Sequence, residues 1–329
     1  MMRKKVYIQA AEQISIQNPL SETWMEEPLH YSEPLVKAVN PQFRDYMAAG
    51  EVRRMGGLMK RALVTTLQVL KKTGIEHPDA VMTGTSIGSL DYTERFLDAM
   101  TENGEETMSP TWFMQSTHNT VGSSLAIYTK THGYNVTYSH GSISFDLAVQ
   151  DAWMQLQLGK IGNALVGGHD EMVEHYFNCL KKAGYVGQEG QVPCGEVAMS
   201  MLLTTDEHAG HLCELAGIRL CHNPSKETLK QQIDSLLAEA QLTMDDLDAV
   251  MTGVNGKPAN DSLYQQTVET FFAGKQLLTY KDLFGENYTV SALGLYAAAH
   301  LVNKGKAKSI LLLNQTEEGD YSFFIVKSE

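Results

Sequence analysis

The chain has 329 residues, of which 43% are hydrophobic and 20% are charged, a composition typical of a soluble globular protein. Its formal net charge of −13 argues against nucleic-acid binding as the main function, because no long basic stripe offsets the negative charge. Four cysteines without a Cys-x-x-Cys pair indicate neither a disulfide framework nor a zinc site, and no apolar run is long enough for a signal peptide or a membrane span. We expect a cytoplasmic protein without cofactor or metal.

The first half of the chain alternates predicted strands and helices. Hydrophobic periodicity and turn residues predict strands at Val6–Ser15, Ala80–Gly84, Asn135–Ser139, Ala164–Val166 (ending in Gly167-Gly168) and Glu196–Thr204. Helices are predicted at Glu51–Thr73, Asp91–Met100, Asn119–Thr131, and from the turn at His140-Gly141 through Leu158.

The second half repeats this order in shorter form. Strands are predicted at Glu214–Leu220, Ala249–Gly253, Gln276–Tyr280, Ile310–Leu313 and Tyr321–Val326, and helices at Glu227–Ala240, Ser262–Phe272 and Val290–Val302. The last two strands read as a hairpin. Two such units predict a layered α/β/α/β/α sandwich built from an N-terminal half, residues 1–205, and a C-terminal half, residues 206–329.

A repeated hexapeptide supports two matching halves. Asp-Ala-Val-Met-Thr-Gly occurs at Asp79–Gly84 and again at Asp248–Gly253, and an amphipathic helical stretch precedes each copy. One fold unit used twice usually places its chemistry on the loops where the halves meet.

Three local motifs have plain structural explanations. The turn Gly84–Gly88 lacks the lysine of a P-loop and indicates a tight strand-to-helix connection. The segment His169–His175 is rich in metal-ligand residue types, but its two histidines are six apart and do not share a helix face, which favours a solvated loop. Lys281 and Glu286 could be catalytic as a buried pair, although an exposed pair is the expectation from sequence.

Ser142 lies in the turn His140–Ser144 between a predicted strand and a predicted helix. A serine there could be a nucleophile or an anion contact, because the helix N-terminus carries a positive partial charge. The alternative, which local sequence favours, is an N-cap that only satisfies backbone N–H groups. The nucleophile pattern Gly-x-Ser-x-Gly is not matched.

The order of elements and turns resembles the thiolase-like β-ketoacyl synthases from Val6 to Val326. The landmarks are Gly84–Gly88, Gln115–Thr120, Gly167-Gly168, Gly195–Ala198, Asn255-Gly256 and Asn260-Asp261. Within that family, Gln115–Thr120 and Gly285–Leu293 look most like the chain-length-factor-like subunits of aryl polyene clusters. The chain is shorter than a typical condensing enzyme, so some loops that cap the active site are expected to be missing.

Condensation in this family, as the resemblance implies, uses one cysteine at the N-terminus of a central helix and two histidines. The cysteine position falls on Ser142, the first histidine on Gly253, and the second on Glu286 in a motif that retains Lys281. Because no cysteine precedes Cys179, an alignment slip cannot restore the nucleophile. Loss of condensing activity is therefore expected.

Other polar residues are expected near the same pocket. His118 and His140 are candidates to replace the lost histidines, and Asn255 is a further candidate for the pocket wall. The C-terminal loop also departs from the family: Asn314–Gly319 is acidic, where condensing enzymes carry a glycine- and phenylalanine-rich gate. Controlled admission of an acyl chain from this side is not expected.

The favoured hypothesis is a non-condensing, chain-length-factor-like subunit in polyketide, aryl polyene or fatty-acid-type biosynthesis. It would pair with an active β-ketoacyl synthase through the strand after Asn135, act together with an acyl carrier protein, and shape or block the acyl tunnel of its partner. One alternative is a serine-dependent acyltransferase or thioesterase that uses Ser142 with His140 or His118. Another is a homodimer with only a binding role.

Overall fold

The computed structural model describes residues 4–104 and 108–329; residues 1–3 and 105–107 of the N-terminal half lie outside this description. The strands are β1 Tyr7–Ile14, β2 Ala80–Gly84, β3 Tyr134–Tyr138, β4 Asn163–Asp170, β5 Val197–Thr204, β6 Cys213–His222, β7 Ala249–Thr252, β8 Gln276–Thr279, β9 Ser309–Gln315 and β10 Asp320–Lys327. The α-helices are α1 Ala49–Arg54, α2 Gly57–Thr73, α3 Leu90–Asn103, α4 Pro110–Ser116, α5 Thr120–Tyr128, α6 Ser144–Gln157, α7 Glu174–Lys182, α8 Lys226–Glu239, α9 Pro258–Phe271, α10 Lys281–Phe284 and α11 Ser291–Asn303. Two 3₁₀ turns span Thr23–Met25 and Phe43–Asp45.

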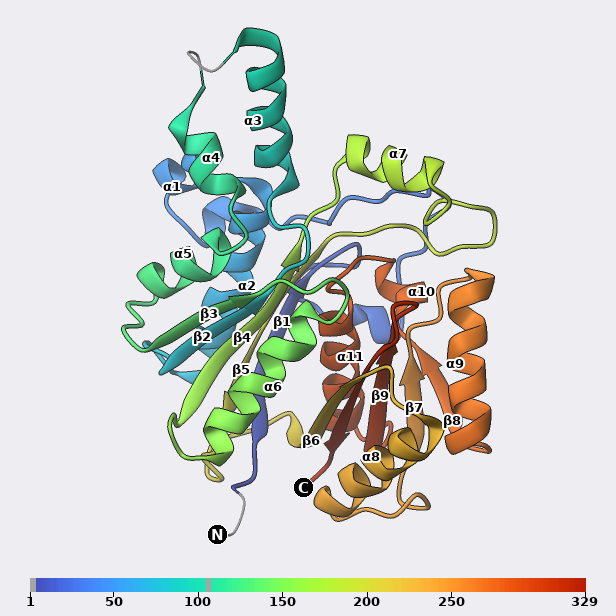
Figure 1. Cartoon of the computed structure of the whole chain (residues 1–329). Helices are drawn as coiled ribbons and strands as arrows, with labels where there is room; N and C mark the ends of the chain where they lie inside the picture. Colours follow the sequence, from blue (N-terminus) through green and yellow to red (C-terminus); the bar gives the residue numbers. More distant parts are fainter. Residues whose placement is uncertain (1–3, 105–107) are drawn as a thin grey trace.

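The strands follow the order β3-β2-β4-β5-β1-β6-β10-β9-β7-β8 (Figure 1). The first five belong to the N-terminal half and the last five to the C-terminal half, and the two sets have equivalent orders when read outward from β1 and β6. These two strands join the sets through only two residue pairs, Tyr7 with Glu214 and Ile8 with Cys213. The boundary predicted at residues 205 and 206 falls in the connection between β5 and β6.

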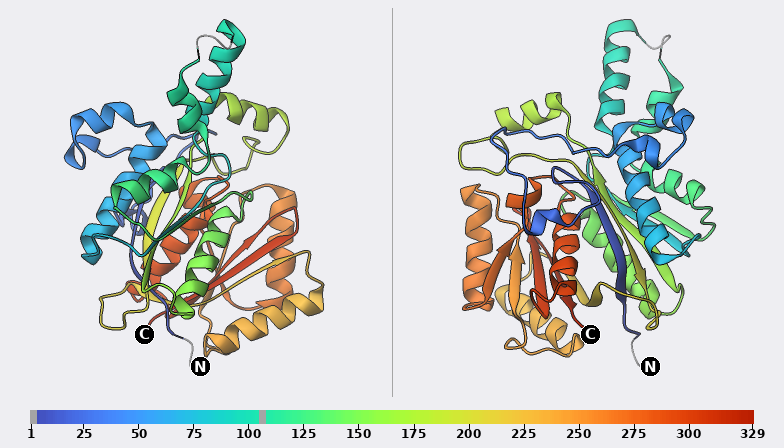
Figure 2. Two further views of the ribbon diagram at one scale, coloured as in Figure 1. Left: turned by 60° about the vertical axis from the view of Figure 1, so that its left-hand side comes forward. Right: turned by 180° about the vertical axis from the view of Figure 1, so that it is seen from behind.

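Helices α6 and α11 lie between the two half-sheets, α2, α5, α8 and α9 cover the outer faces, and α3 projects from the body together with α4 (Figures 1 and 2). The central apolar cluster joins Phe145 of α6 and Leu295 of α11 to residues from both half-sheets. Separate clusters lie under α2 and α5 on one outer face and under α8 and α9 on the other. The five-layered α/β/α/β/α sandwich is thereby confirmed.

The repeated hexapeptide has the same structural role in both halves. Asp79 precedes β2, and its Oδ2 accepts the backbone N–H groups of Gly162 and Asn163 at 2.7 and 3.2 Å. Asp248 precedes β7, and its Oδ2 accepts those of Lys308 and Ser309 at 2.6 and 3.3 Å. Each aspartate thus ties the start of its strand to the start of the neighbouring parallel strand.

The elements differ from the prediction in four places: one predicted helix is divided in two, and α4, α7 and α10 were not predicted. The helix predicted at Glu51–Thr73 is two helices, α1 and α2, because the chain is extended at Met55 and Gly56. Helices α4 and α7 were not predicted, although Ser109 followed by Pro110 is a helix-start signal. Within the described residues, no helix combines the length and apolar character that crossing a bilayer requires.

Candidate functional site

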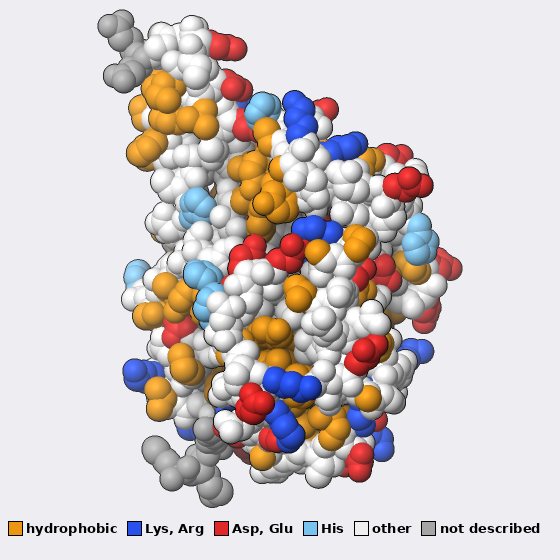
Figure 3. All heavy atoms as spheres, turned by 45° about the vertical axis from the view of Figure 1, so that its right-hand side comes forward, with side chains coloured by type: hydrophobic (Ala, Val, Ile, Leu, Met, Phe, Trp, Pro, Cys, Tyr) orange, Lys and Arg blue, Asp and Glu red, His pale blue; other side chains and the backbone are white. Residues whose placement is uncertain are grey.

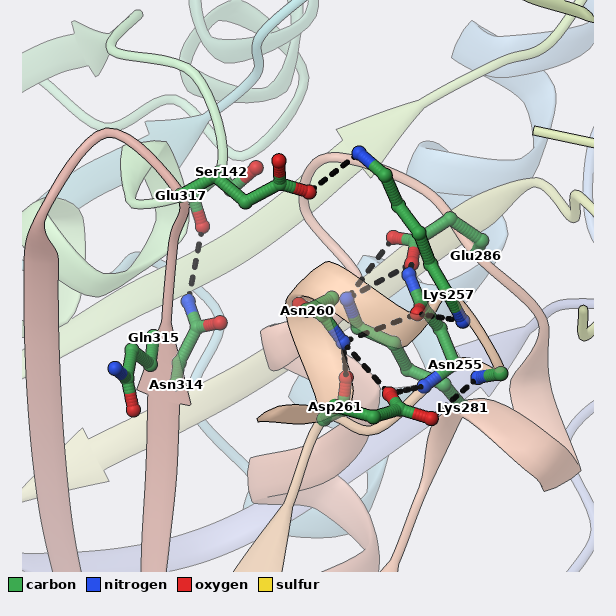
Figure 4. A network of polar contacts seen from close by, with 12 residues as sticks. Ser142, Asn255, Lys257, Asn260, Asp261, Lys281, Glu286, Asn314, Gln315 and Glu317 are labelled. Carbon is green, nitrogen blue, oxygen red and sulfur yellow. Dashed lines mark hydrogen bonds and ion pairs between the residues drawn. The ribbon is translucent and has the colours of Figure 1, made fainter. Parts of the chain in front are cut away.

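A pocket of about 400 Å³ lies where the two halves meet, at the place that the duplicated fold predicts. Its polar wall comes from both halves: Ser142 precedes α6, Asn255 follows β7, Glu286 follows α10, and Asn314 is in β9 (Figure 4). Its apolar wall consists of Met172, Leu180, Tyr185, Val186, Cys194 and Tyr288. The pocket therefore combines the charged pair Lys281 and Glu286, several side-chain amides and one apolar wall.

Ser142 lies at the pocket but does not cap the central helix. Helix α6 begins at Ser144 after Ile143, so the N-cap interpretation of Ser142 is wrong. Ser144 makes the local contacts instead: its Oγ accepts the His140 N–H at 2.8 Å and donates to the Gly141 carbonyl at 2.7 Å. The carbonyl of Ser142 accepts a hydrogen bond of 3.0 Å from the Asn314 amide, which fixes the backbone of the turn.

Neither candidate histidine completes a catalytic pair with Ser142. His140 and His118 are exposed and do not line the pocket, whereas Asn255 does. The His118 ring contacts the Ser86 carbonyl at 3.2 Å and borders a separate small cavity. Throughout residues 4–104 and 108–329, no hydrogen bond joins the Ser142 hydroxyl to an imidazole.

Behind Ser142 lies a fully buried carboxylate, Asp146, in the first turn of α6. It accepts hydrogen bonds from Ser291 at 2.6 Å, from Asn314 at 2.7 Å and from Ser322 at 2.5 Å. Burial raises the pKa of Asp146, and these three donors oppose the rise. The network fastens α6 to α11, β9 and β10, so it joins the halves directly behind the pocket.

Asp146 was not among the candidate site residues predicted from the sequence. The available signal was a carboxylate at a position that helical periodicity assigns to the buried face of α6. Its partners lie more than a hundred residues away in the sequence, so their convergence could not be read from it.

The position of the first expected histidine is filled by other side chains. A Cβ placed on Gly253 would lie 2.6 Å from the hydroxyl oxygens of both Tyr264 and Tyr280, and 3.1 Å from Lys281 Cε. Both tyrosines are fully buried. The Tyr264 hydroxyl is also fixed, since it donates to the Gln315 carbonyl and accepts the N–H of the same residue. No side chain can occupy residue 253 without rearranging this core.

Glu286, at the position of the second expected histidine, forms an ion pair with Lys281. The lysine Nζ lies 3.0 and 2.9 Å from the two carboxylate oxygens, and Asn255 Nδ2 donates to Oε2 at 2.6 Å (Figure 4). Lys281 is buried, so the expectation of an exposed pair is wrong. Burial by itself would lower the pKa of Lys281, but Glu286 together with Tyr264 and Asp261 outweighs burial and raises that pKa.

The backbone of Glu286 is held as firmly as its side chain. Its N–H donates to the Pro193 carbonyl at 2.7 Å, and its carbonyl accepts the Gly195 N–H at 3.0 Å. Cys194, between these partners, is the cysteine that lines the pocket. Burial, with a further contribution from Glu286, raises the pKa of this thiol to about 12, the opposite of what a nucleophilic cysteine requires.

Charged side chains from two loops also line the pocket. Lys257, in the β7–α9 connection, forms an ion pair with Glu317 in the β9–β10 turn (Figure 4). The ammonium group also lies 5.2 Å from the centre of the Tyr185 ring, a cation–π distance. Three separate segments therefore meet at the pocket: the β7–α9 connection, the residues after α7, and the acidic β9–β10 turn.

The glycine-rich turn Gly84–Gly88 encloses a side chain of the protein itself. Asp170 Oδ1 accepts the backbone N–H groups of Ser86, Ile87 and Gly88 at 3.0 to 3.1 Å and the Thr85 hydroxyl at 2.5 Å. A nest of this kind could bind an anion, but Asp170 already occupies it. The turn connects β2 with α3, as predicted.

The prediction of a solvated loop at His169–His175 is wrong for its first residues, because His169, Asp170 and Glu171 are buried. Glu171 accepts the Ser89 hydroxyl at 3.0 Å and lies 3.7 Å from an Arg61 nitrogen. These contacts are structural. Across the part of the chain that the structure describes, no group of histidine, cysteine and acidic side chains is arranged to hold a metal ion.

His169 is expected to make stability depend on pH. Burial lowers its pKa to about 3, and neither ring nitrogen has a hydrogen-bond partner among the described residues. The unfolded imidazole takes up a proton below about pH 6.5 while the folded one does not, so acid favours unfolding. Between pH 7 and pH 5 this residue should remove about 2 kcal/mol from the free energy of unfolding.

Urea unfolding at the two pH values measures this effect as the difference between the wild type and His169→Asn. The exposed His132→Asn is the control and should retain the pH dependence of the wild type. An equal pH dependence in all three proteins would contradict the assignment.

Comparisons with known proteins agree with this architecture. The family model described as "Beta-ketoacyl synthase, N-terminal domain" matches residues 22–256. The solved structure of the ishigamide ketosynthase/chain length factor is similar with a TM-score of 0.85 and 15% identity, covering 100% of both chains. A search of curated proteins found no match.

Two further solved structures are similar at comparable levels. A β-ketoacyl synthase from Burkholderia phymatum has a TM-score of 0.81 and 15% identity, covering 99% of this chain and 100% of that one. The ketosynthase ApeO in complex with its chain length factor ApeC, from Xenorhabdus doucetiae, has a TM-score of 0.80 and 14% identity, covering 99% and 98%. At these identities the similarity shows the fold.

Proposed function

The chain belongs to the β-ketoacyl synthase family, and we propose that it is a non-condensing, chain-length-factor-like subunit that pairs with an active synthase. The observation that carries the proposal is the occupied histidine position: the space a side chain at Gly253 would need holds the hydroxyl groups of Tyr264 and Tyr280. The core therefore has no free space for a histidine side chain at residue 253.

The other two positions support the same proposal. Ser142 has no base within hydrogen-bonding distance in the described chain, and a serine hydroxyl needs one to attack an acyl donor. Glu286 is committed to Lys281 and Asn255, so it cannot polarise an acyl carbonyl as a histidine would. The serine-dependent acyltransferase is therefore not the function that the geometry supports best.

Pairing through β3 is supported by what surrounds this edge strand. Of the ten large hydrophobic side chains that are exposed in the described residues, four lie on or directly after β3 and the two helices that contact it, α5 and α6: Ile127, Tyr134, Met154 and Leu158. Four more, Leu97, Met100, Phe113 and Met114, lie on α3 and α4. Figure 3 shows apolar side chains gathered on the arm that α3 and α4 form. An unpaired edge flanked by apolar surface is typical of an interface.

The proposed partner is a synthase that retains its cysteine and both histidines, and the proposed role is to shape the tunnel in which an acyl chain grows on an acyl carrier protein. The ishigamide and ApeO/ApeC structures are ketosynthases described together with chain length factors, which supports this choice of partner. We place the product class among polyketides, with aryl polyenes as the specific expectation.

The double variant Ile127→Asp/Met154→Asp tests the pairing. Ile127 is 77% exposed and Met154 is 45% exposed, on helices that contact β3. Carboxylates buried at the interface would be unpaired, so we expect the complex with a co-expressed synthase to weaken by at least about 100-fold. Size-exclusion chromatography and calorimetric titration measure this change.

Leu277→Asp is the matched control, because Leu277 is 53% exposed on β8 at the opposite end of the sheet order. This variant should bind the synthase like the wild type. Separate elution of the wild-type chain and the synthase would contradict the proposed function, as would full binding by the double variant.

A further inference from the structure

A wide basic depression lies at the amino ends of β2, β3 and β4, at the opposite end of these strands from the pocket. Its volume is about 820 Å³. Its cationic or titratable basic lining residues are Lys4, His77, Lys130, His132 and Lys160. Such a cluster is unexpected in a chain whose net charge is −13, because like charges brought together repel unless an anion lies between them.

The lysines reach the depression from separate connections. Lys4 precedes β1, Lys130 lies between α5 and β3, and Lys160 lies between α6 and β4. All three are exposed, and none forms an ion pair with any other described residue. The carboxylate in the lining, Asp79, has its Oδ2 engaged by two backbone N–H groups of the β4 start. The positive charge is therefore available to a partner.

The depression adjoins the edge proposed for pairing. Tyr134, the first residue of β3, belongs to its lining and is 43% exposed. When two edge strands pair across a two-fold axis perpendicular to the sheet, they run antiparallel. The amino end of β3 then faces the carboxyl end of the partner strand, and the side chains that follow that strand approach the depression.

A second copy of this chain does not supply the missing negative charge at that place. Its β3 ends at Tyr138 and continues with Ser139 and the exposed His140. The carboxylate that contacts this strand, Asp151, accepts the Tyr138 hydroxyl at 3.0 Å and the Gln155 amide at 3.1 Å, so both of its oxygens are engaged within its own subunit. The segment that follows β3 directly contributes no acidic side chain to the lysines in a self-paired dimer.

We infer that the basic depression selects a heterologous partner whose edge strand is followed by acidic side chains, in preference to a second copy of this chain. The inference rests on the proposed function, since it describes the partner that pairs with β3. Charge complementarity of this kind mainly accelerates association and excludes wrong partners.

The double variant Lys130→Glu/Lys160→Glu tests this inference. Its control is Lys226→Glu/Lys306→Glu, which changes the net charge equally at two exposed lysines on the C-terminal half. The dissociation constant with a co-expressed condensing synthase is measured at about 50 and about 200 mM salt. We expect the depression variant to bind about tenfold more weakly at low salt and to lose most of the salt dependence, and the control to stay within about twofold of the wild type.

Equal affinity and equal salt dependence of the two double variants would overturn this inference and leave the proposed function standing. A wild-type chain that dimerises tightly with itself and does not bind the synthase would overturn both.

Discussion

Gly253→Ala is expected to lower the free energy of unfolding by about 2 kcal/mol, and Gly253→His by more, so that a histidine cannot be introduced at this position by one substitution. The reason is the 2.6 Å approach of a Cβ to the hydroxyl oxygens of Tyr264 and Tyr280, both fully buried. Urea unfolding followed by tryptophan fluorescence measures the change.

A rescue variant makes the prediction specific. Tyr280→Phe removes one of the two close contacts and gives up only the interaction of the Tyr280 hydroxyl with Tyr264, so by itself it should cost little. Gly253→Ala/Tyr280→Phe should therefore recover part of the stability that Gly253→Ala loses. Gly210→Ala is the control, because a Cβ there meets open space. If Gly253→Ala were as stable as this control, the position would not be filled as described.

Asp146→Ala is expected to cost about 4 kcal/mol of unfolding free energy, because it leaves the buried donors of Ser291, Asn314 and Ser322 without their shared acceptor. The network joins α6 of one half to three elements of the other. We therefore expect unfolding to remain a single transition at a lower denaturant concentration, measured by circular dichroism.

Two further variants serve as controls for the stability of Asp146→Ala. Asp245→Ala removes an exposed carboxylate and should change stability by less than about 0.5 kcal/mol. Asp146→Asn keeps the shape and one acceptor oxygen, so it should be less destabilised than Asp146→Ala and remains measurable if the alanine variant does not fold. Stability of Asp146→Ala within about 1 kcal/mol of the wild type would show that the network does not join the halves.

The fold could be predicted from the sequence because its signals are local and repeated. The two hexapeptide copies mark β2 and β7, and their aspartates make equivalent contacts to β4 and β9. Periodicity also gave most of the strands and helices that flank them. Helix α7 was not predicted because its sequence is only nine residues long and polar on average, with Phe177 as its buried residue.

The site could be predicted only in part. Ser142 and Glu286 were assigned to catalytic positions through the family resemblance, and both residues line the pocket; of the pocket candidates His118, His140 and Asn255, only Asn255 does. The side chains that fill the space at Gly253 could not be predicted. Tyr264 lies in α9 and Tyr280 directly precedes α10, and only the tertiary structure brings the two side chains together. The burial of the Lys281–Glu286 pair could not be predicted either, because the spacing of two residues in the sequence does not distinguish a buried pair from an exposed one.

The most direct test of the central claim is an assay of the purified chain with acyl and malonyl carrier proteins, alone and together with the condensing synthase, read by intact mass and product analysis. We predict that the chain alone acquires no acyl adduct and forms no β-ketoacyl product, whereas its presence changes the length of the product made by the synthase. An acyl adduct that disappears in Ser142→Ala, accompanied by β-ketoacyl product from the chain alone, would contradict the account.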